Sequence, residues 1–206
     1  MNAETRVPFD WAAATQAAGN DSFSGDQYLL QPAGDRVLLA VVDGLGHGEK
    51  AAEVAEMAIA VLRDHAHEPP EALFQRCHRR LIGSRGVVMS LASVDVADGR
   101  LTWLGVGNVE GILLRADVSQ RREAILLRGG IVGYRLPALH PTTISLARGD
   151  VLLLATDGLR SAFARDIQPG RSAAEMADEL LARYLRGNDD ALILVARYLG
   201  AEPGAP

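Results

Sequence analysis

Short runs of apolar residues, separated by turn residues, give the first expectations for this chain. Residues 36–42 and 151–155 are almost continuously apolar, which is typical of buried strands. The other candidates are less regular, and the alanine-rich residues 11–17 are the weakest of them. The predicted strands are 11–17, 26–31, 36–42, 86–96, 100–106, 110–115, 123–127, 142–147, 151–155 and 191–198.

The spacing of the apolar positions becomes helical after Glu49. A stripe of Ala, Val and Leu residues predicts a helix from Glu49 to Pro69-Pro70, and this proline pair opens a second helix over residues 71–81. A third helix is predicted from Ser172, because Ser172 and Glu175 have the spacing of a capping box before another apolar stripe.

The order of these elements favours antiparallel sheets covered by helices. Strands occur mostly in hairpins, such as the pair joined by Asp98-Gly99, and the helices are inserted as a pair in the middle and as one near the end. Strands and helices do not alternate one by one, which argues against a doubly wound parallel sheet. We see no repeat or internal linker, so we expect one domain over residues 1–199 and a frayed tail over 200–206.

Composition and charge limit the classes of function. The chain has 206 residues, 48% of them hydrophobic, and its net charge of −5 disfavours a nucleic-acid-binding surface. The single cysteine, Cys77, excludes an intrachain disulfide and a cysteine-based zinc site. Residues 1–10 lack the apolar segment of a signal peptide, and no apolar run approaches the ~20 residues of a membrane helix. We therefore expect a cytoplasmic protein without a membrane segment.

Two Asp-Gly pairs, Asp43-Gly44 and Asp157-Gly158, stand where a buried strand ends and helical sequence follows. A carboxylate there costs desolvation free energy unless it is paired or binds a cation, and no Lys or Arg lies in the five residues before either Asp. One interpretation is that both are helix N-caps. The other is a shared site, to which Asp26 and one of Asp189 and Asp190 could contribute, since neighbouring strand residues point to opposite faces.

A shared site of this kind has a definite chemistry. Carboxylates without a His or Cys cluster suit hard cations, Mg²⁺ or Mn²⁺. Several carboxylates around two such ions ~3.5–4 Å apart would form a two-metal hydrolytic centre. Phosphate-binding loops fit the stretch after Asp43 poorly, because Glu49 stands where a dinucleotide-binding or Walker loop needs a glycine.

Four short motifs in this order make a more specific pattern than any one of them. They are Ser24-Gly25-Asp26, Asp43-Gly44-Leu45-Gly46-His47-Gly48, Ala155-Thr156-Asp157-Gly158-Leu159 and Asp189-Asp190-Ala191. Together they resemble the metal-dependent PPM (PP2C-like) protein phosphatases, above all the SpoIIE-type bacterial branch, over about residues 10–198. Residues 105–111 and 128–134 also resemble a small stressosome phosphatase of that branch. The resemblance implies an α+β fold, an α-β-β-α sandwich of two antiparallel sheets flanked by helices.

The resemblance also implies a ligand set for two ions, Mn²⁺ or Mg²⁺. Asp43 would bridge both ions, and the Gly44 carbonyl would bind one of them. Asp157 and Asp189 would bind the other, and Asp26 would complete its shell directly or through water. Asp43 and Asp157 would thus be the catalytic residues, acting through a metal-activated water.

The implied reaction is hydrolysis of phosphoserine or phosphothreonine, without a phosphoenzyme. The implied substrates are phosphorylated STAS-domain proteins of a stressosome, RsbR-like and RsbS-like, so that the enzyme gives negative feedback on stress signalling. We expect a monomer. Two alternatives stay open: a phosphatase of an anti-anti-sigma factor outside a stressosome, and a degenerate module that binds phosphoprotein without hydrolysing it.

The chain departs from the family pattern at two places. Leu45 stands where eukaryotic members carry a histidine proposed as general acid, and His47, two positions later, is expected to cap or pack in the loop. No arginine clearly matches the family's phosphate-binding arginine, and Arg128 and Arg135 are only candidates. The substrate-binding residues are therefore unknown at this level.

Overall fold

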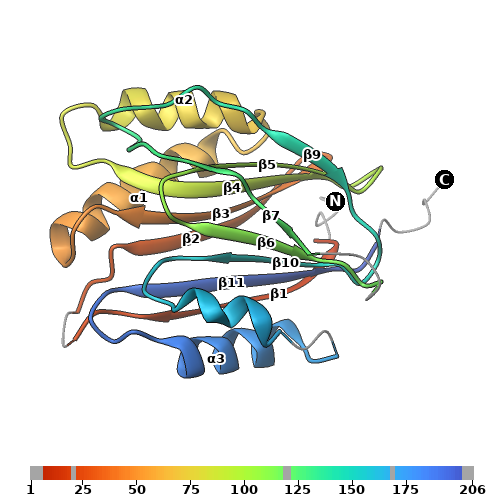
Figure 1. The fold of residues 1–206 in the computed structure, drawn as a ribbon. Helices are drawn as coiled ribbons and strands as arrows, with labels where there is room; N and C mark the ends of the chain where they lie inside the picture. The colour runs from red at the N-terminus through yellow and green to blue at the C-terminus, as the bar shows by residue number, and fades with distance from the viewer. Residues whose placement is uncertain (1–6, 20–21, 118–121, 168–169, 201–206) are drawn as a thin grey trace, which may run out of the picture.

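Two β-sheets stacked face to face, with helices on both outer sides, form the body of the computed structural model (Figure 1). The structure describes residues 7–19, 22–117, 122–167 and 170–200. Pairing is antiparallel throughout both sheets except for a short parallel contact between β5 (Arg100–Val106) and β8 (Leu127–Arg128). The predicted α-β-β-α sandwich is confirmed.

The first sheet lies beneath two helices and has the strand order β2-β3-β4-β5-β8, with β9 also paired to β5. Besides β5 and β8, its strands are β2 (Asp26–Ala33), β3 (Arg36–Gly44), β4 (Val87–Asp95) and β9 (Thr142–Ser145). The hairpin predicted at Asp98-Gly99 joins β4 to β5, and Gly99 takes a positive φ of 65° there.

The second sheet has the strand order β1-β11-β10-β6-β7. Its strands are β1 (Phe9–Gln16), β6 (Glu110–Leu114), β7 (Glu123–Ala124), β10 (Val151–Ala155) and β11 (Ala191–Tyr198). Helix α3 (Ala173–Tyr184) covers its outer face, and the predicted capping box is present: Ser172 Oγ accepts from the Glu175 backbone N, while the Glu175 carboxylate accepts from the Ser172 backbone N.

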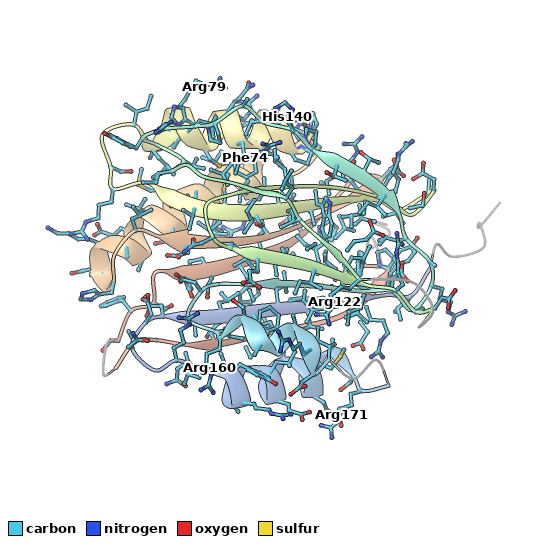
Figure 2. All side chains as sticks on the ribbon, viewed as in Figure 1. Phe74, Arg79, Arg122, His140, Arg160 and Arg171 are labelled. Atoms are coloured by element: carbon cyan, nitrogen blue, oxygen red, sulfur yellow. The ribbon has the colours of Figure 1, made fainter. Side chains whose placement is uncertain are left out.

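Helices α1 (Glu49–Asp64) and α2 (Pro70–Leu81) bury their apolar stripes against the first sheet. Figure 2 shows this polarity on α2, where Phe74 lies on the side of the sheet and Arg79 on the outer surface. Pro70 starts α2, a position at which the missing backbone N–H of proline costs no hydrogen bond.

Strand β3 is almost continuously apolar because both of its faces are covered. Leu38 and Val42 belong to the core beneath α1 and α2, whereas Leu39 and Val41 belong to the core between the two sheets. Each of these fully buried side chains contributes about 1.5–3 kcal/mol to the free energy of unfolding. The same double coverage accounts for the apolar run of β10, which lies between α3 and the first sheet.

Three predicted strands are arranged differently from a simple series of hairpins. Residues 123–127 form two short strands in different sheets instead of one, because the chain crosses between the sheets at Leu126, which is 63% exposed. Residues 142–147 and 151–155 do not pair across their turn: β9 joins β5, whereas β10 joins the second sheet. A 3₁₀-helix, Ser161–Arg165, follows β10 without a clear sequence signal.

The two ends of the described chain lie together, where the Leu199 backbone N donates to the Pro8 carbonyl at 2.9 Å. Of the tail predicted to be frayed, residues 201–206 lie outside the described residues. Among the helices that the structure describes, none is long and apolar enough to cross a membrane.

Candidate metal centre

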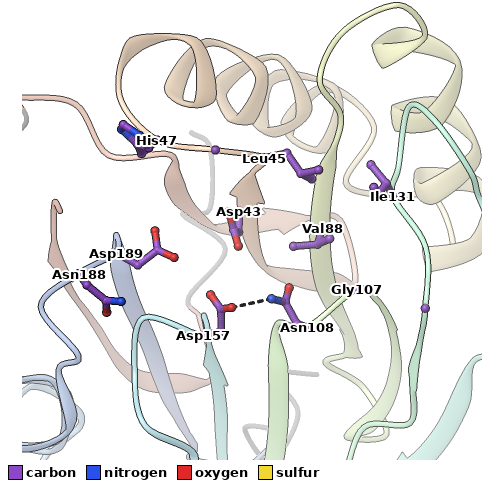
Figure 3. Close-up of a pocket in the computed structure, with 12 residues that line it drawn as sticks. Asp43, Leu45, His47, Val88, Gly107, Asn108, Ile131, Asp157, Asn188 and Asp189 are labelled. Atoms are coloured by element: carbon purple, nitrogen blue, oxygen red, sulfur yellow. Dashed lines mark hydrogen bonds between the residues drawn. The ribbon is translucent and has the colours of Figure 1, made fainter.

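Aspartates from both sheets meet at one end of the sandwich. Asp43, near the end of β3, is paired in register with Asp26 at the start of β2, while Asp157 follows β10 and Asp189 precedes β11. A cavity of about 560 Å³ opens there. It is lined by Asp43, Leu45, Gly46, His47, Val88, Gly107, Asn108, Gly129, Ile131, Asp157, Asn188 and Asp189. The carboxylates of Asp43, Asp157 and Asp189 point toward a common space (Figure 3).

The register of β2 and β3 places two carboxylates directly opposite each other, an arrangement that is unfavourable without a cation. Asp26 is only 4% exposed and does not line the cavity itself. Burial raises the pKa of Asp26 to about 7, and Asp190 adds to the rise. Burial also raises the pKa of Asp43 to about 8, with repulsion from Asp26 as the next contribution. Neither Lys nor Arg occurs among the described residues that line the cavity.

Two neighbouring side chains orient these carboxylates. Thr156 Oγ1 donates to Asp26 Oδ2 at 2.6 Å and accepts from the Leu192 backbone N at 2.9 Å, so it ties the first sheet to β11. Asn108 Nδ2 donates to Asp157 Oδ2 at 2.8 Å (Figure 3). Sequence reasoning gave neither residue a role, although a threonine at the buried end of an apolar strand is a usable signal.

The structure distinguishes the roles of Asp189 and Asp190, which strand periodicity alone could not distinguish. Asp189 lines the cavity, whereas Asp190 is 4% exposed and turned away from it. Asp190 Oδ1 accepts from the Ala18 backbone N at 2.8 Å, and Oδ2 accepts from the Gly25 backbone N at 2.7 Å. Asp190 therefore holds the loop that leads into β2, and it is not solvent-facing.

The two Asp-Gly glycines are required by packing. A Cβ on Gly44 would lie 2.2 Å from the Ala51 carbonyl O, and one on Gly158 would lie 2.0 Å from the Asp190 carbonyl O. Each glycine thus lets its loop approach neighbouring backbone closely. This requirement exists without any ion, so the glycine at position 44 is not by itself evidence for a carbonyl ligand, and that role stays a prediction.

The N-cap interpretation of the aspartates is wrong. Helix α1 begins after Gly48, which makes no side-chain cap, and the 3₁₀-helix after β10 begins after Arg160. Asp43 and Asp157 lie several residues before these positions and point into the cavity (Figure 3). His47 also lines the cavity.

The donor set fits a hard divalent cation. Its atoms are carboxylate oxygens, and no lining cation neutralises their charges among the described residues. Burial raises the pKa of Asp26 and of Asp43, which favours their protonation until a positive charge is supplied. Within the described residues, no three His, Cys, Asp or Glu side chains already form a closed group around one point. The aspartates therefore converge without forming a finished coordination shell.

The α-β-β-α sandwich, with aspartates from both sheets gathered at one end, has the fold of the PP2C-like phosphatases. The family described as stage II sporulation protein E (SpoIIE) matches residues 33–199, and the chain belongs to the SpoIIE family. The branch predicted from the four motifs is confirmed.

Individual relatives agree with this assignment. Phosphoserine phosphatase RsbX of Bacillus subtilis (strain 168) is 25% identical over 171 residues, which cover 82% of this chain and 84% of RsbX. A solved structure from work on the bacterial stressosome, described as a modular system adapted to control secondary messenger signalling, is 32% identical. Its TM-score is 0.83, with 92% of this chain and 99% of that chain covered. RsbX in complex with magnesium shares the fold, with a TM-score of 0.82 at 22% identity over 91% of this chain and 94% of that chain.

Proposed function

We propose that this chain is a metal-dependent serine/threonine phosphatase that dephosphorylates STAS-domain proteins of a stressosome, RsbR-like and RsbS-like, and so gives negative feedback on stress signalling. The observation that carries the metal dependence is the convergence of aspartates from both sheets in a cavity whose described lining holds no Lys or Arg. The substrate class is supported by the likeness to RsbX, a phosphoserine phosphatase, and to a structure from stressosome work. A cytoplasmic location and a monomeric state belong to the same proposal.

In this proposal, Asp43, the Gly44 carbonyl, Asp157, Asp189 and Asp26 would together hold two Mg²⁺ or Mn²⁺ ions. When bound, such ions supply an acidified water and neutralise the oxygens of the phosphoryl group.

The chain's own residues prepare the cavity for this chemistry. The hydrogen bond from Asn108 fixes one oxygen of Asp157 and leaves the second oxygen free to point inward. Leu45, Val88 and Ile131 give the cavity an apolar side (Figure 3), which limits water there and strengthens electrostatic interactions inside. Leu45 cannot move a proton, so general-acid catalysis from the position after Asp43-Gly44 is not part of the proposal.

The test measures phosphate release from a kinase-phosphorylated STAS protein, with Mn²⁺, Mg²⁺ or EDTA. Wild type, Asp43→Ala and Asp157→Ala are compared. We expect metal-dependent release from wild type and a loss of more than about 100-fold in both variants, because even outer-shell partners of metal ligands are worth 10–100-fold.

The remaining outcomes separate the alternatives. Release that continues in EDTA would overturn the metal-dependent mechanism. Stable binding of the phosphoprotein without release would indicate a docking module instead. Release from an anti-anti-sigma factor but not from stressosome STAS proteins would keep the chemistry and change the substrate.

A further inference from the structure

One wall of the cavity is built by two segments that are distant in sequence. The loop after α2, residues 82–86, meets the Asp43-Gly44 loop where the Leu45 backbone N donates to the Gly86 carbonyl at 3.1 Å. The next residue, Val87, exchanges two backbone hydrogen bonds with Val132, at 3.0 and 2.8 Å. Ile131, just before Val132, faces the cavity next to Val88 (Figure 3). These contacts give the mouth of the cavity a fixed border.

Arg85 lies on this border without lining the cavity. A Cβ on Gly46, a lining residue, would lie 2.7 Å from Arg85 Nη1, so the guanidinium rests directly against the Gly46 backbone. Arg85 is exposed, and it makes no hydrogen bond or ion pair within the described ranges of the chain. Its backbone is held from both sides, because Ser84 Oγ donates to the Leu81 carbonyl at 2.7 Å and accepts from the Gly86 backbone N at 3.1 Å.

Two large apolar side chains belong to the same two segments. Ile82, in the loop of residues 82–86 that carries Arg85, is 66% exposed. Tyr134, whose backbone N donates to the Ile131 carbonyl, is 79% exposed. The turn that carries Tyr134 packs on the end of α2, since a Cβ on Gly133 would lie 2.8 Å from Leu81 Cβ. We call Ile82, Arg85 and Tyr134 the docking rim.

We propose that the docking rim binds the polypeptide on either side of the phosphorylated residue and selects an acidic side chain there, which would pair with Arg85. This inference rests on the proposed phosphatase function. It concerns the polypeptide that flanks the phosphorylated residue and lies outside the cavity. The position of Arg85 supports it: the guanidinium lies outside the lining, so it reaches the substrate beyond the phosphoryl group. Charge supports it as well. Arg85, without a partner among the described residues, would attract an acidic substrate segment that the protein's net charge of −5 would otherwise repel.

In this proposal, Ile82 and Tyr134 provide the apolar contacts to the substrate. Tyrosine is enriched in binding surfaces because its ring gives a large contact area while its hydroxyl stays hydrated. Ile82 and Tyr134 would cover an apolar side chain of the substrate next to the acidic one. A protein substrate, unlike a small phosphate ester, can make all of these contacts.

The test uses two phosphoserine peptides that differ only by Glu or Lys at the positions flanking the phosphoserine, with p-nitrophenyl phosphate as a substrate that has no polypeptide. The variants are Arg85→Glu and, as a matched control, Arg63→Glu, an exposed arginine near the far end of α1. We expect wild type and Arg63→Glu to prefer the Glu peptide in kcat/KM by about 5-fold, the size of one exposed ion pair. We expect Arg85→Glu to prefer the Lys peptide.

Misfolding of part of a preparation lowers kcat/KM for both peptides equally and leaves their ratio unchanged. A reversed peptide preference in Arg85→Glu would therefore support the docking rim. Equal use of both peptides by wild type, or an unchanged preference in Arg85→Glu, would overturn the rim while the phosphatase proposal stands. Absence of metal-dependent hydrolysis of p-nitrophenyl phosphate by wild type would overturn both proposals.

Discussion

The two ends of the sandwich hold buried carboxylates in opposite electrostatic settings. At one end, Asp150 is 1% exposed and fully paired inside the chain. Arg115 Nη1 donates to its Oδ2 at 2.9 Å, and the backbone N atoms of Ala116 and Ala147 donate to it at 2.8 and 2.9 Å. Asp150 thereby joins the turn before β10 to the end of β6.

At the other end, Asp43 on β3 and Asp26 on β2 face each other. Burial disfavours their negative charges and raises the pKa of Asp43 to about 8 and that of Asp26 to about 7. Removing a buried carboxylate whose countercharge lies in the chain destabilises the fold, because the countercharge is then left unpaired. One whose countercharge is missing is available for a cation from solution. The same residue type is thus structural at one end of the sandwich and prepared for chemistry at the other.

The largest effect should come from Asp43→Asn, because it removes a charge from the unpaired end. We expect hydrolysis of p-nitrophenyl phosphate in Mg²⁺ to fall by more than about 100-fold. The melting temperature in EDTA at pH 8 should stay the same or rise, since repulsion with Asp26 is relieved. Activity assays and thermal melts on the same preparation measure both. A large fall in the melting temperature would show that Asp43 makes stabilising contacts as Asp150 does, which would contradict the difference between the two ends.

The opposite pattern is expected for Asp150→Ala. Removing this carboxylate leaves Arg115 and two backbone N–H groups without their acceptor, which should lower the free energy of unfolding by about 3–5 kcal/mol. Activity per folded molecule should be unchanged. Asp98→Ala is the matched control, because its ion pair with Arg100 is exposed and worth less than about 1 kcal/mol. Denaturant melts measure the difference, and equal losses in the two variants would contradict it.

The unpaired end should also reverse the usual pH dependence of carboxylates. The pKa values of Asp26 and Asp43 keep both carboxyls protonated in the folded protein up to pH values near 7 and 8, whereas the unfolded chain releases these protons near 3.8, the ordinary pKa of an aspartate. Between pH 4 and pH 8 the folded state therefore binds more protons than the unfolded state. In EDTA, the free energy of unfolding should fall as the pH rises from about 4 to 8. Each raised pKa corresponds to several kcal/mol, so the expected fall in melting temperature exceeds about 10 °C, at about 2–4 °C per kcal/mol for a chain of this size.

Magnesium should remove this fall, because the cation replaces the bound protons. The difference in melting temperature between saturating Mg²⁺ and EDTA should therefore be largest at pH 8 and smallest near pH 5. Asp43→Asn should flatten the EDTA curve. Stability in EDTA that rises with pH over the same window would contradict the raised pKa values.

Much of this comparison could be predicted from the sequence, because both strands involved are covered on two faces. Continuous apolar runs marked β3 and β10, and an aspartate at the end of such a run has few explanations. The four aspartates that came together were all named beforehand. Their role as metal ligands stays a prediction, since the structure shows their convergence and not an ion.

What the sequence could not give were contacts between segments far apart in the chain. Asp190 was indistinguishable from Asp189 until the Ala18 and Gly25 backbone N atoms were placed beside it. The split of residues 123–127 depends on which sheet each half joins, and no local propensity encodes that choice. Arg85 has no motif, and only its contact with Gly46 connects it to the cavity.

The smallest effect we predict concerns Thr156, which links the unpaired end to the core. Thr156→Val keeps the shape of the side chain and removes the O–H that donates to Asp26 Oδ2 at 2.6 Å. Loss of this hydrogen bond, which opposes the rise in the pKa of Asp26, should raise that pKa further and weaken Mg²⁺ binding by about 10-fold. The free energy of unfolding should fall by about 1 kcal/mol.

Titration of Mg²⁺-dependent activity gives the first quantity and denaturant melts give the second. Thr156→Ser should restore both, while Thr102→Val, which breaks an exposed hydrogen bond with Thr143, should change neither. The two readouts separate two roles for the hydroxyl, because it also accepts from the Leu192 backbone N at 2.9 Å. A loss of stability with unchanged Mg²⁺ dependence would mean that Thr156 only joins β10 to β11, and the orientation of Asp26 would then come from the β2–β3 register alone.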